Sequence, residues 1–377
     1  MSDKLPRKSF LEKLGLGIAS FFTAPIIGKS NTTSIVMNEK PVISRIQEMG
    51  FQWETADPFL FCVHHEDYFP KGNAEMAPDK SFLKGRHLGD DFIIKDGFRM
   101  YHGKQVPGFP GHPHRGFETI TIVRKGLVDH ADSLGAAGRY GNGDVQWMTA
   151  GKGVQHSEMF PLLHSNKDNP LELFQIWLNL PARRKMVEPH FKMLWAEQIP
   201  HHFHRDAAGK QTEVEVITGK LGNDTGVGCP PDSWAAEPKN EVAIWNIRME
   251  PGAVFTLPAA SPGLNRKLYF YLGSGISVEN QQIPSYHSFM AQSEKALSIR
   301  NGSDEARLLL LQGRPIGEPV IQYGPFVMNT KEEIHQAFDD YHRTQFGGWP
   351  WPKPGQVHER SAGRFALHAD GKKEQKG

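Results

Sequence analysis

The sequence has few cysteines and almost no charge imbalance, and both absences exclude whole classes of protein. Only Cys62 and Cys229 occur among 377 residues, and they match neither a CxxC motif nor a zinc-finger spacing. We therefore expect two buried free thiols rather than a disulfide. Lysine and arginine (43) nearly balance aspartate and glutamate (42), which gives a net charge of +1. This balance provides no broad basic face, so direct nucleic-acid binding is not expected.

Long hydrophobic runs are also missing. The longest, from Leu14 to Ile27, is about 14 residues, which is short for a bilayer span but suits a signal sequence. The preceding "RKSFLEK" resembles a twin-arginine export signal in which Lys8 replaces the second arginine. Residues 1–30 are thus predicted to be a leader for export to the periplasm. The alternative is a cytoplasmic protein in which this segment is an amphipathic helix or a loose tail. No other segment could be transmembrane.

Turn-forming residues are abundant, with 38 glycines and 27 prolines, and this favours an all-β architecture. "FETITIVRKG" (117–126) alternates polar and apolar residues as a half-buried strand does. Similar patterns occur at 171–181, 241–259, 266–275 and 306–315. Two strand-rich blocks, divided near residues 190–205, predict two similar β-sandwiches in tandem. A helix is predicted at 331–348, followed by an extended, partly disordered tail.

The stretch "FPGHPHRGFE" (109–118) places His112 and His114 two residues apart. Side chains at i and i+2 of a strand share a face, about 6.6–6.8 Å apart, so both imidazoles could reach one ion. Pro113 between them is tolerated at a sheet edge or a bulge. The pair alone does not decide between a metal site and ordinary surface histidines.

A second stretch, "GKGVQHSEMF" (151–160), repeats this spacing with His156 and Glu158. Two antiparallel strands of one barrel could aim both pairs at a common point. The predicted metal ligands are His112, His114, His156 and Glu158. Three imidazoles and one carboxylate suit iron(II), with manganese, nickel or zinc as substitutes. An octahedral ion would keep positions open for water, O2 or substrate.

Long motifs around these residues resemble the pirin family of the cupin superfamily. They are "GFPGHPHRGFETI", "GDVQWMTAGKGVQHSEM", "FQIWLNLP", "KMVEP" and "GEPVIQYGPFVMNTKEEIHQAF". The resemblance implies a bicupin, that is, two double-stranded β-helix barrels in tandem with a short C-terminal helix. It places the metal, usually iron, on the four residues named above. The implied organisation is a metal-binding cupin at 31–195, a metal-free cupin at 196–330, and a C-terminal helix and tail at 331–377.

Other polar residues near the motifs are candidates for supporting roles. Glu118 is expected to be structural or to support a ligand, rather than to bind metal itself. Arg115, Gln146 and Gln175 are candidates for orienting the ligands, although Gln146 and Gln175 could equally be ordinary polar positions on barrel strands. The segment 62–108 is longer than in many pirins and is expected to form a lid or an oligomer contact. Its histidines and acids at 64–67 are not expected to form a second metal site.

Two functions follow from the resemblance. The first is a quercetin 2,3-dioxygenase-like enzyme, which opens a flavonol ring with O2 and uses Glu158 as ligand and general base. The second is a metal-dependent, redox-responsive binding or regulatory protein without turnover, acting on a protein partner. The neutral charge and the leader favour the enzyme.

Overall fold

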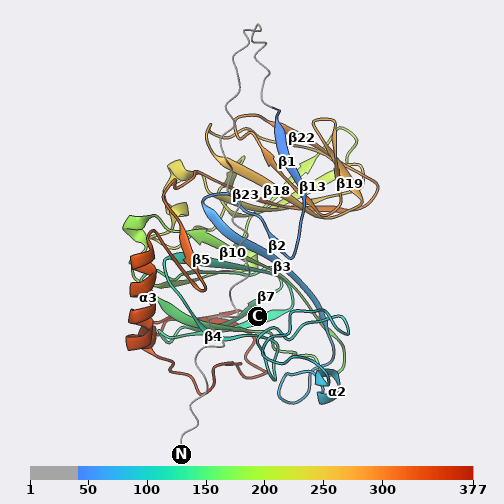
Figure 1. Ribbon diagram of the computed structural model, residues 1–377. Coiled ribbons are helices and arrows are strands. Elements are labelled where there is room, and N and C mark those ends of the chain that lie inside the picture. Colours follow the sequence, from blue (N-terminus) through green and yellow to red (C-terminus); the bar gives the residue numbers. More distant parts are fainter. Residues whose placement is uncertain (1–40, 377) are drawn as a thin grey trace, which may run out of the picture.

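The computed structural model describes residues 41–376, and the predicted leader at 1–30 lies outside them. Two β-barrels lie one above the other in Figure 1, with the helix α3 (Lys331–Thr344) against the side of the lower one. The architecture is therefore mostly β with two cupin barrels and a short C-terminal helix, which confirms the predicted fold class. None of the helices within 41–376 has the length and apolar composition that a membrane crossing requires.

The first barrel consists of two six-stranded sheets that face each other. One has the order β11-β8-β5-β10-β3-β2, and its strands are β2 (Gln52–Trp53), β3 (Phe59–Phe69), β5 (Phe117–Lys125), β8 (Val145–Thr149), β10 (Asn169–Asn179) and β11 (His190–Leu194). The other has the order β27-β26-β7-β6-β9-β4, and its strands are β4 (Gly108–His114), β6 (Leu127–Asp132), β7 (Ala137–Gly141), β9 (Val154–Met159), β26 (Arg364–Leu367) and β27 (Lys373–Lys376).

The second barrel pairs a seven-stranded sheet with a four-stranded one. The larger sheet, in the order β1-β21-β18-β23-β16-β13-β12, contains β1 (Ile43–Glu48), β12 (His201–Arg205), β13 (Gln211–Thr218), β16 (Ala243–Met249), β18 (Asn265–Leu272), β21 (His287–Ala291) and β23 (Ala306–Gly313). The smaller sheet contains β17 (Val254–Leu257), β19 (Gly275–Val278), β20 (Gln281–Pro284) and β22 (Leu297–Asn301).

Shorter elements connect these sheets. They are the helix α2 (Lys80–Leu83), the hairpins β14 (Lys220–Leu221) with β15 (Asp224–Thr225) and β24 (Ile321–Tyr323) with β25 (Phe326–Met328), and the 3-10 turns Ala182–Arg184, Ala196–Gln198, Trp234–Ala236, Pro238–Asn240 and Gln345–Gly347. The predicted helix is confirmed at 331–344. A capping box, in which Thr330 accepts from the Glu333 N–H and Glu333 accepts from the Thr330 N–H, fixes its start.

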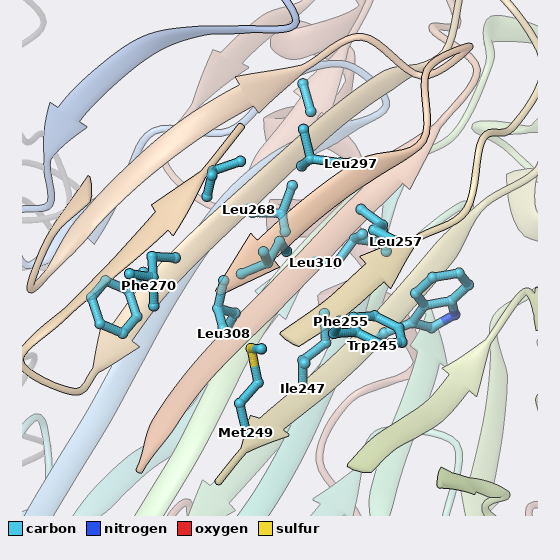
Figure 2. Packing of buried hydrophobic residues seen from close by; sticks show 14 of the residues in the cluster. Trp245, Ile247, Met249, Phe255, Leu257, Leu268, Phe270, Leu297, Leu308 and Leu310 are labelled. Carbon is cyan, nitrogen blue, oxygen red and sulfur yellow. The ribbon is translucent and has the colours of Figure 1, made fainter. Parts of the chain in front are cut away.

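Apolar side chains fill the interior of the second barrel. Figure 2 shows Trp245, Leu268 and Leu310 among a cluster that points inward from both sheets. A second apolar cluster, the inter-barrel core, packs the outer face of the first barrel's β5, β8 and β10 against β16, β18 and β23. Cys62 lies buried in this core, whereas Cys229 is only half-buried at its side; both cysteines are free thiols.

The strands at the two ends of the described chain each join the barrel that is more distant in sequence. The blue strand β1 lies in the upper barrel of Figure 1 and pairs with β21, whereas the red C-terminal segment lies in the lower barrel. Sheet pairing crosses the predicted domain boundaries, since β1 pairs with β21 and β26 pairs with β7. The domain ranges 31–195 and 196–330 therefore stay predictions. The prediction of a partly disordered tail is wrong for the described residues. The β26–β27 hairpin extends the first barrel by pairing with the free edge of β7.

Candidate metal centre

The strands β4 and β9 carry the two predicted ligand pairs and lie side by side. They are antiparallel, and His112 stands directly opposite His156. A bulge between Phe109 and His112 contains Pro110, and Pro113 is tolerated because β4 is the edge strand of its sheet. The i, i+2 spacing therefore brings three imidazoles from two adjacent strands to one face of the sheet.

The three imidazoles form a compact group. One ring nitrogen from each of His112, His114 and His156 lies within 4.8 Å of the others. Three atoms at this separation share a centre at most about 2.8 Å from each, against metal–nitrogen bonds of about 2.0–2.1 Å. Small side-chain rotations would close that difference. The geometry is consistent with a cupin metal site.

The hydrogen bonds of the imidazoles also suit a metal. Nδ1 of His112 donates to the Pro110 carbonyl at 3.0 Å, and Nδ1 of His114 faces the Pro325 carbonyl at 3.4 Å. A neutral imidazole whose Nδ1 donates in this way leaves the Nε2 lone pair for a metal. His156 is completely buried, and neither of its ring nitrogens has a partner. An unpartnered buried imidazole destabilises the fold unless a ligand occupies it.

Burial also keeps these rings in the form that binds metal. It lowers the pKa of His112 to about 4, and it lowers the pKa of His114 and of His156 well below the usual value. Each ring is therefore neutral near pH 7, and a neutral imidazole is the ligand form. The residues present thus fit a divalent metal held by nitrogen donors.

Comparisons with known proteins agree with this geometry. Residues 45–178 match the pirin family, and residues 244–347 match the pirin C-terminal cupin domain. Human pirin is 33% identical over 68% of this chain and 83% of its own length. Pirin-like protein 2 of Arabidopsis thaliana is 37% identical over 68% of this chain and 75% of its own length. The chain belongs to the pirin family.

Two further similarities concern proteins with an enzymatic name. A Vibrio cholerae protein with the provisional name quercetin 2,3-dioxygenase is 38% identical over 64% of this chain and 80% of its own length. A crystal structure of quercetin 2,3-dioxygenase from Acinetobacter baumannii has a TM-score of 0.63 and 26% identity, over 81% of this chain and 98% of that one. The pirin fold of this chain is therefore shared with a protein that bears that name.

Glu158, the predicted carboxylate ligand, lies two residues beyond His156 but outside the group of three imidazoles. Its Oε1 accepts from Thr121 Oγ1 at 2.7 Å and from the Tyr140 hydroxyl at 3.3 Å, and its Oε2 faces Gln175 Nε2 at 3.3 Å. Burial raises the pKa of Glu158, while the hydrogen bond from Thr121 opposes that shift. Its role as ligand stays a prediction.

Apart from Gln175, the sequence did not indicate the residues that surround this carboxylate. Thr121 comes from β5 and Tyr140 from β7, and His130 of β6 stands directly opposite Glu158 with its ring 5.6 Å from that of His156. Thr121 lies on the predicted strand 117–126, and its place on that strand is the only signal, because no strand was predicted for the segments of His130 and Tyr140. That signal becomes specific only when the pairing of the strands is known.

The other sequence candidates lie in different surroundings. Arg115 donates to the Lys152 carbonyl and pairs with Asp340 at 2.9 Å, so it joins the metal strand to α3. Gln175 contacts Glu158, as a supporting residue would, whereas both amide atoms of Gln146 are buried without a partner. Trp177 lies beside the site, with its ring 5.4 Å from that of His114.

Glu118 faces away from the metal centre. Its carboxylate accepts from Thr149 Oγ1 at 2.7 Å and from Ser233 Oγ at 2.5 Å, at the boundary with the second barrel. Burial raises its pKa to about 7. This position confirms the structural role that the sequence predicted for Glu118.

The segment 62–108 packs into the apolar cluster of the first barrel through Phe98, Met100 and Tyr101. Tyr101 is buried, and its hydroxyl contacts His65 Nδ1 at 2.9 Å and Asp67 Oδ2 at 2.5 Å. Asp67 also pairs with Arg99 at 3.0 Å, while His64 points to the other face of β3 and stacks on Phe174. The cluster at 64–67 is thus divided between two faces. The role of the segment as a lid or an oligomer contact stays a prediction.

Proposed function

We propose that this pirin-family protein is a non-haem metal-dependent dioxygenase that acts on flavonols and related phenolic rings such as quercetin. The observation that carries the proposal is the buried group of His112, His114 and His156. Support also comes from the relatives named quercetin 2,3-dioxygenase, one of which shares the fold over 98% of its own length.

Iron(II) is the proposed metal, with manganese, nickel or zinc as substitutes. Imidazole nitrogens with one carboxylate are donors that all four ions accept, and the thiolates of a structural zinc site are missing from this group. When bound, the ion would supply Lewis-acid and template chemistry for the oxygen atoms of the substrate and O2.

Glu158 is the proposed fourth donor and the general base for the proton of the flavonol hydroxyl. Glu158 follows His156 by two residues on β9, and burial raises the pKa of its carboxyl group, which makes the carboxylate a stronger base. Thr121 and Tyr140 hold Oε1, and Gln175 faces Oε2. These contacts orient the carboxylate.

Aromatic side chains form the proposed support for the flat substrate. The rings of Phe61 and Trp177 are 4.8 Å apart, and Trp177 also packs at 4.3 Å on Phe117. Phe61 and Trp177 are only half-buried, so they stand where solvent reaches the site. Stacking on these rings would hold an aromatic substrate and exclude water from the reacting atoms.

The test is O2 uptake and carbon monoxide release with quercetin and anaerobically iron-loaded protein. The His114→Ala variant should lose both, whereas His204→Ala, which changes a second-barrel histidine, should keep both. One tightly bound iron per chain without O2 uptake would contradict the enzyme and favour a binding protein.

The second candidate is a metal-dependent, redox-responsive regulatory protein without turnover. It is favoured by exposed apolar side chains on the segment 62–108, where Ile93 is 81% and Ile94 59% exposed. Such side chains suit a protein partner. Hydrogen exchange of residues 62–108 in the Fe(II) and Fe(III) forms tests this candidate, which requires a difference between the two.

Export is proposed as the location, through the twin-arginine-like segment at 1–30, with a cytoplasmic protein as the alternative. The basic start and the apolar run from Leu14 to Ile27 support it. A fusion of residues 1–30 to a reporter should reach the periplasm of cells with an intact twin-arginine system. Retention in the cytoplasm would contradict it.

A further inference from the structure

The inner face of the first barrel carries a row of polar side chains opposite the metal strands. Gln146 of β8 stands directly opposite Thr121 of β5, and Thr121 stands directly opposite Gln175 of β10. Directly opposed residues of antiparallel strands point to the same face. Because Thr121 donates to Glu158, this row faces the candidate metal centre.

The alternation of β8 fixes the direction of Gln146. Its neighbours Val145 and Trp147 both lie in the inter-barrel core, so Gln146 points to the opposite face. Its other cross-strand partner, Met193 of β11, belongs to the apolar cluster inside the first barrel. The Gln146 amide therefore projects into the barrel interior.

Two side chains on this inner face have polar atoms without partners. Gln146 is completely buried, and neither its Nε2 nor its Oε1 makes a hydrogen bond. Thr119 of β5, in the adjacent row, is also completely buried, and its hydroxyl has no partner. Buried polar groups are almost always paired, so unpaired ones indicate a missing ligand or water.

Two adjacent rows, one of Gln175, Thr121 and Gln146 and one of Trp177, Thr119 and Met148, run from the solvent-exposed side of the barrel to its interior. Gln175 is half-buried, whereas Thr121 and Gln146 are completely buried. Thr119 stands directly opposite Met148 on one side and Trp177 on the other, and Trp177 contacts His114. A ligand held against Trp177 beside the metal centre would thus extend along both rows.

We propose that Gln146 and Thr119 determine specificity by binding a ring hydroxyl of the aromatic ligand. The Gln146 amide offers donors at Nε2 and an acceptor at Oε1, and a phenolic hydroxyl both donates and accepts. One hydroxyl can therefore satisfy both amide atoms. The inference rests on the proposed function and deepens it. It states that the site selects polyhydroxylated aromatic rings over rings that lack those hydroxyls.

The test compares the binding of two ligands to metal-loaded protein under anaerobic conditions, where no turnover occurs. The ligands are quercetin and 3-hydroxyflavone, which keeps the 3-hydroxyl and 4-carbonyl but lacks the other ring hydroxyls. Wild type should bind quercetin at least about ten-fold more tightly. Gln146→Met, which keeps the length of the side chain, should remove most of that preference and leave 3-hydroxyflavone binding unchanged.

Two further variants make the result specific. Met148→Leu changes the next inward position of β8 without a polar group, and it should keep the preference. Thr119→Val is isosteric, so it carries the same test if Gln146→Met does not fold, and it should also reduce the preference.

The outcomes separate this inference from the proposed function. If wild type prefers quercetin and both polar variants keep that preference, the inference is overturned and the dioxygenase proposal stands. If neither flavonol binds metal-loaded wild type, the proposed substrate class is overturned, and this inference with it.

Discussion

His156 is the residue at which burial and metal chemistry are most closely linked. Both of its ring nitrogens are buried and unpartnered. Each unsatisfied buried polar group costs about 1–3 kcal/mol, so metal-free protein retains a penalty that metal binding would remove. The destabilising feature of the free protein is thus the feature that prepares it for a ligand.

Glu118 should make stability depend on pH. Burial raises its pKa from about 4.5 to about 7, so the folded protein holds a proton that the unfolded chain releases. Stability should therefore be greatest below about pH 4.5 with respect to this group and should fall as pH rises to about 7. Glu118→Gln should remove that fall, which is on the order of 3 kcal/mol.

Urea unfolding at several pH values between 4.5 and 8 measures this effect. Glu332→Gln, which changes an exposed glutamate of α3, serves as the control and should follow wild type. If the free energy of unfolding changes with pH to the same extent in wild type and Glu118→Gln, the prediction is wrong and the pKa of Glu118 is not raised by folding.

Thr121 should act on catalysis through Glu158. Thr121→Val keeps the shape of the side chain but removes the 2.7 Å hydrogen bond to Oε1. Residues that orient metal-site groups typically contribute 10–100-fold, so kcat should fall by about that factor. Bound iron should remain at one per chain, and Thr121→Ser should restore activity.

Steady-state O2 uptake and metal analysis of the same samples check this prediction. Unchanged kcat in Thr121→Val would mean that the hydrogen bond does not position the carboxylate. Altered pH dependence of kcat, which a purely structural role would not produce, is the additional readout.

The grouping of three histidines could be predicted from the sequence, but their surroundings could not. His112, His114 and His156 follow from the two-residue period of a strand, which is a local property. Thr121 and Tyr140 meet Glu158 only because β5 and β7 lie where the barrel places them. Local pattern does not encode which strands face each other.

The C-terminal segment that follows α3 and its last turn, residues 348–376, forms a strap across the first barrel. The Gly111 N–H donates to the Pro354 carbonyl at 2.8 Å, and Trp351 Nε1 donates to the Asp132 carbonyl at 2.7 Å. The strap thus contacts both β4, which carries His112 and His114, and β6, which lies on the other side of β9. Its proline-rich composition suggested disorder, because the edge of β7 that orders its end is remote in sequence.

Arg139 holds this strap and should be sensitive to mutation. It is completely buried, pairs with Asp129 through both carboxylate oxygens and donates to the carbonyls of His358, Glu359 and Arg360. Arg139→Met leaves Asp129 buried without its partner and should cost about 3–5 kcal/mol in the free energy of unfolding.

Urea unfolding measures this cost, and proteolysis should cut the released strap first. The double variant Arg139→Met with Asp129→Leu should recover part of the stability, because the unpaired charge is gone. A loss below about 1 kcal/mol in the single variant would contradict the role of Arg139.

For the whole molecule, the two barrels should unfold together. The inter-barrel core joins them, β1 adds to the second barrel's sheet, and the C-terminal hairpin adds to the first barrel's sheet. Calorimetry should therefore show one transition, which metal shifts as a unit to higher temperature. Two transitions, of which only one responds to metal, would show that the barrels are independent.

The tandem arrangement was predictable from the two strand-rich blocks, but the exchange of chain ends was not. The pairing of Ile43 with Ala291 joins residues far apart in sequence, and no local pattern in either strand specifies the other. The sequence boundaries therefore describe the order of the blocks, while the sheets divide the chain differently.

An anaerobic titration with Fe(II), read as tightly bound iron per chain, tests most directly whether the three histidines hold a metal. We expect one iron in wild type, with affinity reduced at least about 100-fold in His156→Ala and unchanged in His204→Ala. Undiminished iron binding in His156→Ala would contradict a site built from His112, His114 and His156.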